Sequence, residues 1–190
     1  MSMSQLTRQW TVGDVHALPD DGNRYEVIDG ELFVTPAPAW RHQRAAFGLC
    51  TLLSDYLKRE RVGDALMAPA DVIFSTKRLV QPDVFVVPLV NGRRPEKFVD
   101  VGKLLLAAEV LSPSTARADR VAKRMLFRDE GVLDFWIVDL DARTVERSTP
   151  AEPRPEILVD ELIWHPEGAS TPLVINLPAY FDTVLGTSAR

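Results

Sequence analysis

The sequence predicts a mixed α/β fold with one central sheet flanked by helices and an N-terminal β-hairpin. Asp29-Gly30 separates two strand-like runs, 25–28 and 31–34, and a two-residue Asp-Gly turn is a strong hairpin signal. Across 41–61 the apolar residues are spaced i, i+3, i+4 and i+7, which indicates one amphipathic helix. Three longer apolar runs are typical of buried strands: 80–88, 103–111 and 134–140.

The first half of the chain adds short elements around these. Gly63 is expected to end the long helix, because glycine commonly stands just after a helix. Pro82 is placed at the start of the strand 80–88, where its missing N–H is tolerated. The other elements expected here are a short helix at 11–18, a strand at 71–74 and a turn containing Lys77 and Arg78.

The second half contains one further helix and a set of weaker elements. The helix is expected at 116–130, with Gly131 as the residue that closes it. The other elements expected here are a strand at 143–147 antiparallel to 134–140, a proline-rich linker at 151–155, strands at 157–164 and 173–177, and a helical turn at 179–185.

The composition is that of an ordinary globular protein. The chain has 190 residues, of which 46% are hydrophobic and 26% are charged, enough for a core without disulfides. We expect a single domain over 1–190, with a core at about 25–148 and a C-terminal β extension at 156–185. Cys50, the only cysteine, falls within the helical pattern and is expected to be a packed thiol.

Charge and targeting signals narrow the function classes. A net charge of −5 argues against an extended surface that coats nucleic acid, while a local basic cleft stays open. The stretch Met1 to Trp10 is polar and lacks the apolar region of a signal peptide. No apolar run approaches the about 20 residues of a membrane-spanning helix. We therefore predict a cytoplasmic protein without a membrane partner.

Two carboxylates interrupt the apolar runs. Asp83 lies near the start of the strand 80–88, and Glu109 lies in the middle of 103–111. A glutamate buried in such a run must be ion-paired, protonated or bound to a metal. A structural salt bridge to an arginine of the following helix is the alternative for Glu109, and a surface acid at a strand end is the alternative for Asp83.

The helix after Glu109 carries five basic residues. Its apolar stripe is Ala118, Val121, Ala122 and Met125, and Lys123 flanks that stripe, so Lys123 could reach back over the sheet. Two carboxylates on neighbouring strands can hold Mg²⁺ or Mn²⁺, and the backbone carbonyl of Val110 could add an oxygen. Such an ion polarises a phosphoryl oxygen and activates water, and a nearby lysine steadies negative charge.

These residues resemble a known pattern. The chain looks like a member of the PD-(D/E)xK nuclease superfamily, with Pro82-Asp83 and Glu109-Val110-Leu111 as the motif, and more narrowly like the bacterial Uma-two family. The markers are Tyr25 to Leu32, Arg41-His42-Gln43, Gln81 to Val84, Glu109 to Thr115, Asp119 with Lys123, and Gly131-Val132 followed by Phe135 to Asp139.

The resemblance implies a restriction-endonuclease-like core and a Mg²⁺-dependent site with Asp83 and Glu109 as metal ligands. The sequence departs from the superfamily pattern at Leu111, which occupies the position of the strand lysine. In the family the lysine is displaced to the following helix, which points to Lys123 as the catalytic lysine.

Glu31 and His42 are second-tier candidates. In the superfamily an acid ahead of the sheet often joins the metal site, and Glu31 follows the Asp-Gly turn; Glu26 on the same hairpin ranks lower. His42 is expected either to contact a substrate phosphate or to be a cap or surface residue.

The leading prediction is a metal-dependent endonuclease that hydrolyses phosphodiester bonds of DNA. Two alternatives stay open: a catalytically inactive nuclease-fold binding or assembly protein, and a small-substrate phosphohydrolase. A homodimer could form through the strand of Trp136 and the segment 157–177.

Overall fold

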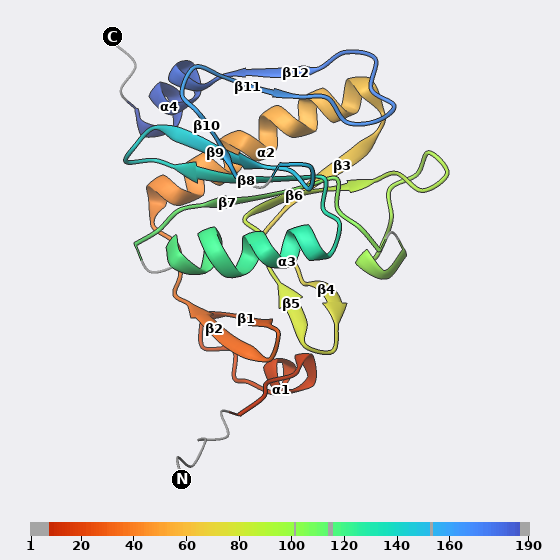
Figure 1. Cartoon of the computed structure of the whole chain (residues 1–190), viewed down its shortest axis with the longest axis vertical. Coiled ribbons are helices and arrows are strands. Elements are labelled where there is room, and N and C mark those ends of the chain that lie inside the picture. The colour runs from red at the N-terminus through yellow and green to blue at the C-terminus, as the bar shows by residue number, and fades with distance from the viewer. Residues whose placement is uncertain (1–7, 101, 114–115, 153, 187–190) are drawn as a thin grey trace.

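A computed structural model describes residues 8–100, 102–113, 116–152 and 154–186, and it confirms the predicted α/β class (Figure 1). A six-stranded mixed sheet forms its centre, in the order β10-β9-β8-β7-β6-β3. β7 and β8 are parallel, and the other neighbouring pairs are antiparallel. The strands are β3 (Gly63–Met67), β6 (Val84–Pro88), β7 (Leu106–Val110), β8 (Asp134–Asp139), β9 (Thr144–Ser148) and β10 (Glu156–Leu158).

One face of this sheet is covered by α2 (Trp40–Glu60) and α4 (Leu177–Leu185), together with the hairpin of β11 (Glu161–Trp164) and β12 (Leu173–Asn176). Alternation along the strands selects the side chains on this face. Residues such as Val84, Ala108 and Trp136 pack there in the larger hydrophobic core.

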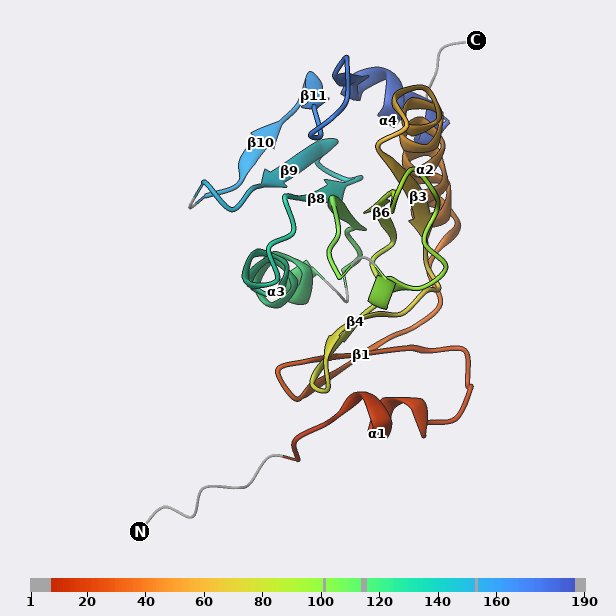
Figure 2. The ribbon, with the colours of Figure 1, turned by 90° about the vertical axis from the view of Figure 1, so that its right-hand side faces the viewer.

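The opposite face packs against the crossover that joins β7 to β8. This crossover contains a π-helical segment, η2 (Ala118–Lys123), that runs directly into α3 (Arg124–Asp129). Leu126 and Phe127 of α3 are buried against Phe135 and Ile137 of β8 in a second core. A short 3₁₀ helix, η1 (Phe98–Asp100), closes the edge of this core, and Figure 2 shows α2 and α3 on opposite sides of the sheet.

A second, four-stranded sheet lies below the central one, in the order β2-β1-β5-β4 (Figures 1 and 2). One face packs on α1 (Val12–His16) through Val27 and Leu79, and the other faces the α3 core through Ile28 and Val80. Its strands are β1 (Arg24–Ile28), β2 (Glu31–Thr35), β4 (Val72–Ser75) and β5 (Arg78–Val80).

The predicted β-hairpin is confirmed as β1 and β2, which pair antiparallel with Ile28 opposite Glu31. Asp29 and Gly30 have φ values of 50° and 83°, the left-handed backbone that a two-residue hairpin turn requires. Side chains alternate between the two faces of a strand, so residues 24, 26 and 28 of β1 share the face towards α3.

The predicted strand 80–88 is wrong as a single element. It divides into the end of β5 in the small sheet and β6 in the central sheet, so Pro82 and Asp83 lie in the link between sheets. Arg78 belongs to β5 and not to a turn, while 157–164 also divides, into β10 and β11.

The helix predicted at 41–61 is confirmed as α2, but Gly63 does not end it. Arg61 adopts the left-handed conformation of the C-cap, with φ 55°, and Gly63 instead begins β3. The apolar spacing over 41–61 includes Leu52, but this side chain is exposed. Among the described residues no helix is long and apolar enough to cross a bilayer.

Candidate active site

Asp83 and Glu109 approach each other where the two sheets meet. Asp83 immediately precedes β6, and Glu109 lies in β7, the antiparallel neighbour of β6. The backbone N–H of Val110 donates to Asp83 Oδ2 at 2.9 Å, which fixes the carboxylate against β7. Both acids are almost completely buried. Glu109 and Ala107 stand two residues apart on β7, so their side chains lie on the same face of the sheet. That face is covered by η2 and not by α2.

Lys123 reaches back from the end of η2 to Glu109, as predicted, but the apolar stripe predicted for this helix is wrong. Val121 and Met125 are exposed, and the buried residues of η2 are Asp119 and Lys123. The Nζ atom of Lys123 lies 2.9 Å from Glu109 Oε1 and 2.9 Å from Glu26 Oε2. Asp119, one turn earlier on η2, places Oδ1 3.6 Å from the same nitrogen. A buried lysine is thus surrounded by three carboxylates.

The N-terminal hairpin contributes two side chains from the inward face of β1. Glu26 accepts a hydrogen bond from the backbone N–H of Gln81 at 2.7 Å, in addition to its contact with Lys123. Arg24 donates from Nη1 to Asp83 Oδ1 at 2.8 Å. The small sheet therefore closes the site from below.

The second-tier candidates separate in the structure. His42, in the first turn of α2, is buried with Nε2 3.0 Å from Asp83 Oδ2. Glu31 is exposed at the start of β2 and makes no ion pair or hydrogen bond with these residues in the described chain. Glu26, ranked below Glu31 from the sequence, is the hairpin acid beside Lys123.

The carboxyl groups have opposite protonation tendencies. Burial raises the pKa of Asp83, but the hydrogen bond and charge of His42 and the charge of Arg24 outweigh it and hold the pKa well below its usual range. Burial raises the pKa of Glu109 well above its usual range. The charge of Lys123 lowers this pKa, but the charges of Asp83 and the other acids raise it further. Two carboxyls of one site that differ in this way are typical of catalytic centres.

Lys123 stays charged in this environment. Burial lowers the pKa of its ammonium group, but the negative charges of Glu109, Glu26 and Asp119 more than offset burial and raise the pKa well above the usual range. Lys123 is therefore a fixed positive charge and not a proton acceptor at neutral pH.

We name these seven residues the acidic cluster: Arg24, Glu26, His42, Asp83, Glu109, Asp119 and Lys123. Its four carboxyl groups face the two permanent cations Arg24 and Lys123, together with His42. Carboxylate oxygens with surplus negative charge are the donor set that Mg²⁺ and Mn²⁺ prefer. The donor chemistry fits a divalent cation.

The present side-chain arrangement is not that of a finished metal cage. Among the described residues, no three His, Cys, Asp or Glu side chains are grouped as metal ligands. Arg24 and His42 take up both oxygens of Asp83, and Lys123 takes up one oxygen of Glu109. A cation held by Asp83 and Glu109 would displace these contacts and would keep water as its remaining ligands.

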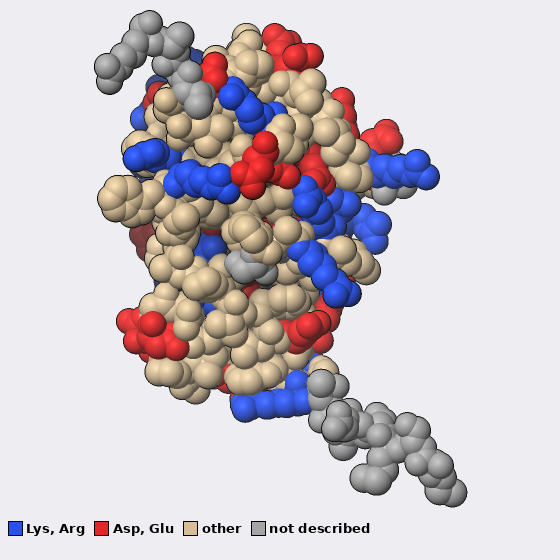
Figure 3. All heavy atoms as spheres, turned by 90° about the vertical axis from the view of Figure 1, so that its left-hand side faces the viewer, with Lys and Arg blue, Asp and Glu red and all other residues tan. Residues whose placement is uncertain are grey.

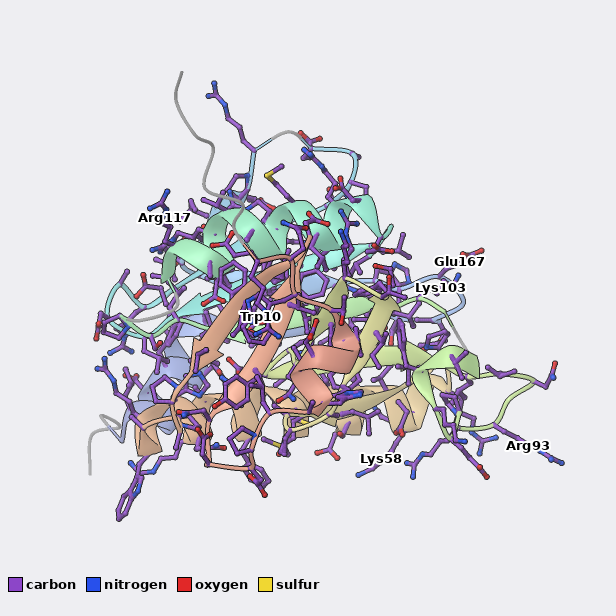
Figure 4. All side chains as sticks on the ribbon, turned by 90° about the horizontal axis from the view of Figure 1, so that it is seen from below. Trp10, Lys58, Arg93, Lys103, Arg117 and Glu167 are labelled. Atoms are coloured by element: carbon purple, nitrogen blue, oxygen red, sulfur yellow. The ribbon has the colours of Figure 1, made fainter. Side chains whose placement is uncertain are left out.

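The cluster lies towards one side of the molecule. Figure 1 shows the start of α2, the end of β7 and the start of the following helical segment on that same side. Figure 3 looks at this side, where Lys and Arg side chains are interspersed with Asp and Glu side chains. Figure 4 shows Arg117 projecting from the start of the helical segment, with the hairpin and α1 in the foreground.

The central mixed sheet flanked by helices, with the carboxylate–lysine cluster where it meets the small sheet, is a nuclease-like α/β fold. The chain belongs to the Uma2 family, whose description is "Putative restriction endonuclease" and whose model matches residues 12–170. Its fold is similar to that in the crystal structure of a putative nuclease belonging to DUF820 from Anabaena variabilis ATCC 29413. That chain is 21% identical, with a TM-score of 0.76, over 92% of this chain and 99% of the other. No curated protein matches the sequence.

Sequence reasoning assigned no role to two members of the cluster. Asp119 carries a usable signal, because it stands four residues before Lys123 on the same helical segment. Arg24 stands two residues before Glu26, so the alternation of side chains along β1 places both on the same face. This alternation is the signal that could have identified Arg24.

Proposed function

We propose that this protein is a metal-dependent nuclease that hydrolyses phosphodiester bonds of DNA. The observation that supports it is the convergence of Asp83, Glu109 and Lys123 in one buried site. These side chains come from two neighbouring strands and the crossover helix, and the lysine is 2.9 Å from the glutamate. Membership of a family whose description is "Putative restriction endonuclease" supports the reaction class.

Each residue has a distinct role in this proposal. Asp83 and Glu109 would hold Mg²⁺ or Mn²⁺, with the carbonyl of Val110 as a further candidate oxygen. When bound, the ion supplies Lewis-acid activation of the phosphoryl group and of a water molecule. Lys123 would orient that water or donate to the phosphoryl oxygen on which charge develops. Glu26 and Asp119 hold the Lys123 ammonium group at the site.

The filled contacts of Asp83 favour a second candidate, a nuclease-fold protein that binds DNA without cleaving it. Both oxygens of this carboxylate already accept hydrogen bonds from protein groups. If these contacts persisted in the presence of metal ions, the site would remain structural. Either function requires contact with DNA, for which the exposed Arg117 at the start of the helical segment is suited (Figure 4).

A homodimer remains a prediction, and the strand of Trp136 cannot form its interface. Trp136 is completely buried between the sheet and the α2 layer. Exposed apolar side chains instead occur on α2 and on the β11–β12 hairpin, where Phe47 and Val174 line a groove of about 590 Å³.

The proposal is tested by cleavage of plasmid and oligonucleotide DNA with Mg²⁺ or Mn²⁺. We expect wild-type cleavage to be abolished by Asp83→Asn and Glu109→Gln, and strongly reduced by Lys123→Arg, which keeps the charge. Asp134→Asn and Glu146→Gln are matched controls, because both acids are buried and ion-paired to arginines outside the cluster.

Loss of cleavage in the cluster variants, with activity kept in the controls and circular dichroism unchanged, supports the nuclease. Wild-type DNA binding with no cleavage under any metal condition supports the binding protein instead. Undiminished cleavage by Glu109→Gln contradicts the proposed site.

A further inference from the structure

Arg24 is the member of the acidic cluster that is most open to the surface. Its side chain is 17% exposed, whereas those of Asp83 and Lys123 are 4% and 5% exposed. It stands at the first position of β1, where the small sheet meets the central sheet. A ligand approaching Asp83 from solvent therefore meets Arg24 before the buried groups.

The hydrogen-bonding capacity of Arg24 is not used up. Nη1 donates to Asp83 Oδ1, while Nε is buried without a hydrogen-bond partner in the described structure. A guanidinium group presents its N–H donors as a planar fork that matches two oxygens of a phosphate or carboxylate. A buried, unsatisfied donor costs free energy, so a second acceptor at this position would be favourable.

Charge balance shows when that acceptor could bind. The four carboxyl groups of the cluster outnumber its two permanent cations. Arg24 now compensates Asp83, the group that a divalent cation would need as a ligand. Once such an ion neutralises Asp83, Arg24 loses its main anionic partner and becomes available to an incoming anion.

We propose that Arg24 is a phosphate-binding residue of this site. It leaves Asp83 when the cation binds and donates hydrogen bonds to the non-bridging oxygens of the phosphodiester. This inference rests on the proposed nuclease function, and it gives Arg24 direct contact with substrate. The negatively charged cluster thereby gains a means of attracting a negatively charged substrate.

Among the other partly buried arginines of the described chain, Arg124 also has a buried Nε without a partner, but its acid, Glu146, lies outside the acidic cluster. Arg78, on the same small sheet, is 21% exposed but is bound by Asp29 and Glu130. Arg120 is bound by Glu146 and Asp139, and neither of these acids belongs to the acidic cluster. Arg78 is therefore a matched control, since it shares the sheet, the residue type and the ion-paired state.

The test measures binding of short DNA duplexes that carry one uncharged methylphosphonate linkage, moved one position at a time. Affinity is measured by fluorescence anisotropy with Ca²⁺ in place of Mg²⁺, so that the readout is independent of turnover. At the contacted linkage we expect wild type to lose about tenfold in affinity, the size of one charge-assisted hydrogen-bonded contact. Arg24→Gln should bind the native duplex about tenfold more weakly. It should also become insensitive to the neutral linkage at that position, while Arg78→Gln keeps the wild-type pattern.

A purely structural role for Arg24 would weaken binding of native and modified duplexes equally. If Arg24→Gln retains the wild-type sensitivity at every linkage, the proposal is overturned. If wild type binds no duplex, the proposed nuclease function fails. The role of Arg24 in binding phosphate is then tested with inorganic phosphate as the ligand. A phosphate-dependent rise in melting temperature with Mg²⁺ that only Arg24→Gln loses would support the phosphate contact. No rise in wild type, or the same rise in both proteins, would overturn it.

Discussion

The Nζ atom of Lys123 lies 2.9 Å from Oε2 of Glu26, and this contact joins the crossover helix to the N-terminal hairpin. Because Glu109 lies at the same distance on the other side, the ammonium group bridges the small sheet and the central sheet. The candidate site is therefore also a structural junction, and changes within it affect both activity and stability.

Removing the Lys123 charge should be costly. Lys123→Met leaves three buried acids without their central cation, and we expect a loss of about 3–5 kcal/mol of unfolding free energy. In a double-mutant cycle with Glu26→Gln, the combined loss should be smaller than the sum of the single losses. Urea unfolding gives the unfolding free energies of the wild type, the two single variants and the double variant. Strictly additive losses would show that the two side chains do not interact.

The raised pKa of Glu109 predicts how stability depends on pH. The folded protein keeps this proton to higher pH than the unfolded chain, so wild-type stability falls as the pH rises from the unfolded value towards the folded one. Glu109→Gln has no proton to lose. Its stability relative to wild type should increase by up to about 1.4 kcal/mol per pH unit in this window. Denaturant unfolding at pH 5, 6.5 and 8 gives the difference, and the same difference at every pH would contradict it.

Divalent cations should stabilise the protein and release protons. Binding requires an ionised Glu109, so affinity for Mg²⁺ or Mn²⁺ should rise with pH. At a concentration 100 times the Kd, the gain in stability is about 2.7 kcal/mol. Calorimetry in buffers with different ionisation enthalpies measures the proton release, and a chelator should reverse the stabilisation. Asp83→Asn should abolish both effects and Asp134→Asn neither; a response unchanged in Asp83→Asn would place the ion elsewhere.

The C-cap of α2 offers a stabilising substitution. Arg61 adopts φ 55° and donates its N–H to the carbonyl of Leu57 at 2.8 Å. Glycine adopts this backbone conformation without the steric cost of a Cβ atom. Arg61→Gly should therefore raise the unfolding free energy by about 0.5–1 kcal/mol, with cleavage unchanged. A loss of stability in thermal unfolding would mean that contacts of the arginine side chain outweigh the strain.

Local patterns predicted the elements whose residues face one core. The hairpin at Asp29-Gly30 and the helix α2 are specified by turn chemistry and by apolar spacing, and both are confirmed. The prediction of a single strand at 80–88 was wrong because this run contributes residues first to the small sheet and then to the central sheet. Leu79 and Val80 pack with the small sheet, and the apolar pattern resumes at Val84 in the central sheet. An apolar run does not record a change of sheet.

The choice between Glu26 and Glu31 shows where sequence reasoning about the site ends. Both acids lie on the same face of the hairpin. Glu31 is paired directly opposite Ile28, and Ile28 stands two residues from Glu26 on the same strand. Which one meets Lys123 depends on where the crossover helix passes over the small sheet. That position is set by the packing of Phe127 and Val80 in the second core, which no local spacing encodes.

The π-helical segment η2 has a consequence for comparing relatives. A π turn contains one residue more than an α turn, and it is what a single-residue insertion leaves in a helix whose ends stay in place. Deleting the exposed Val121 would restore an α turn and rotate Asp119 by about 100° relative to α3, while Lys123 stayed with α3. A relative that lacked this extra residue would carry its helical lysine one position nearer to the β7 glutamate, and it would lose the carboxylate that Asp119 places beside Lys123. An alignment that demands a constant interval would pair the wrong residue with Lys123.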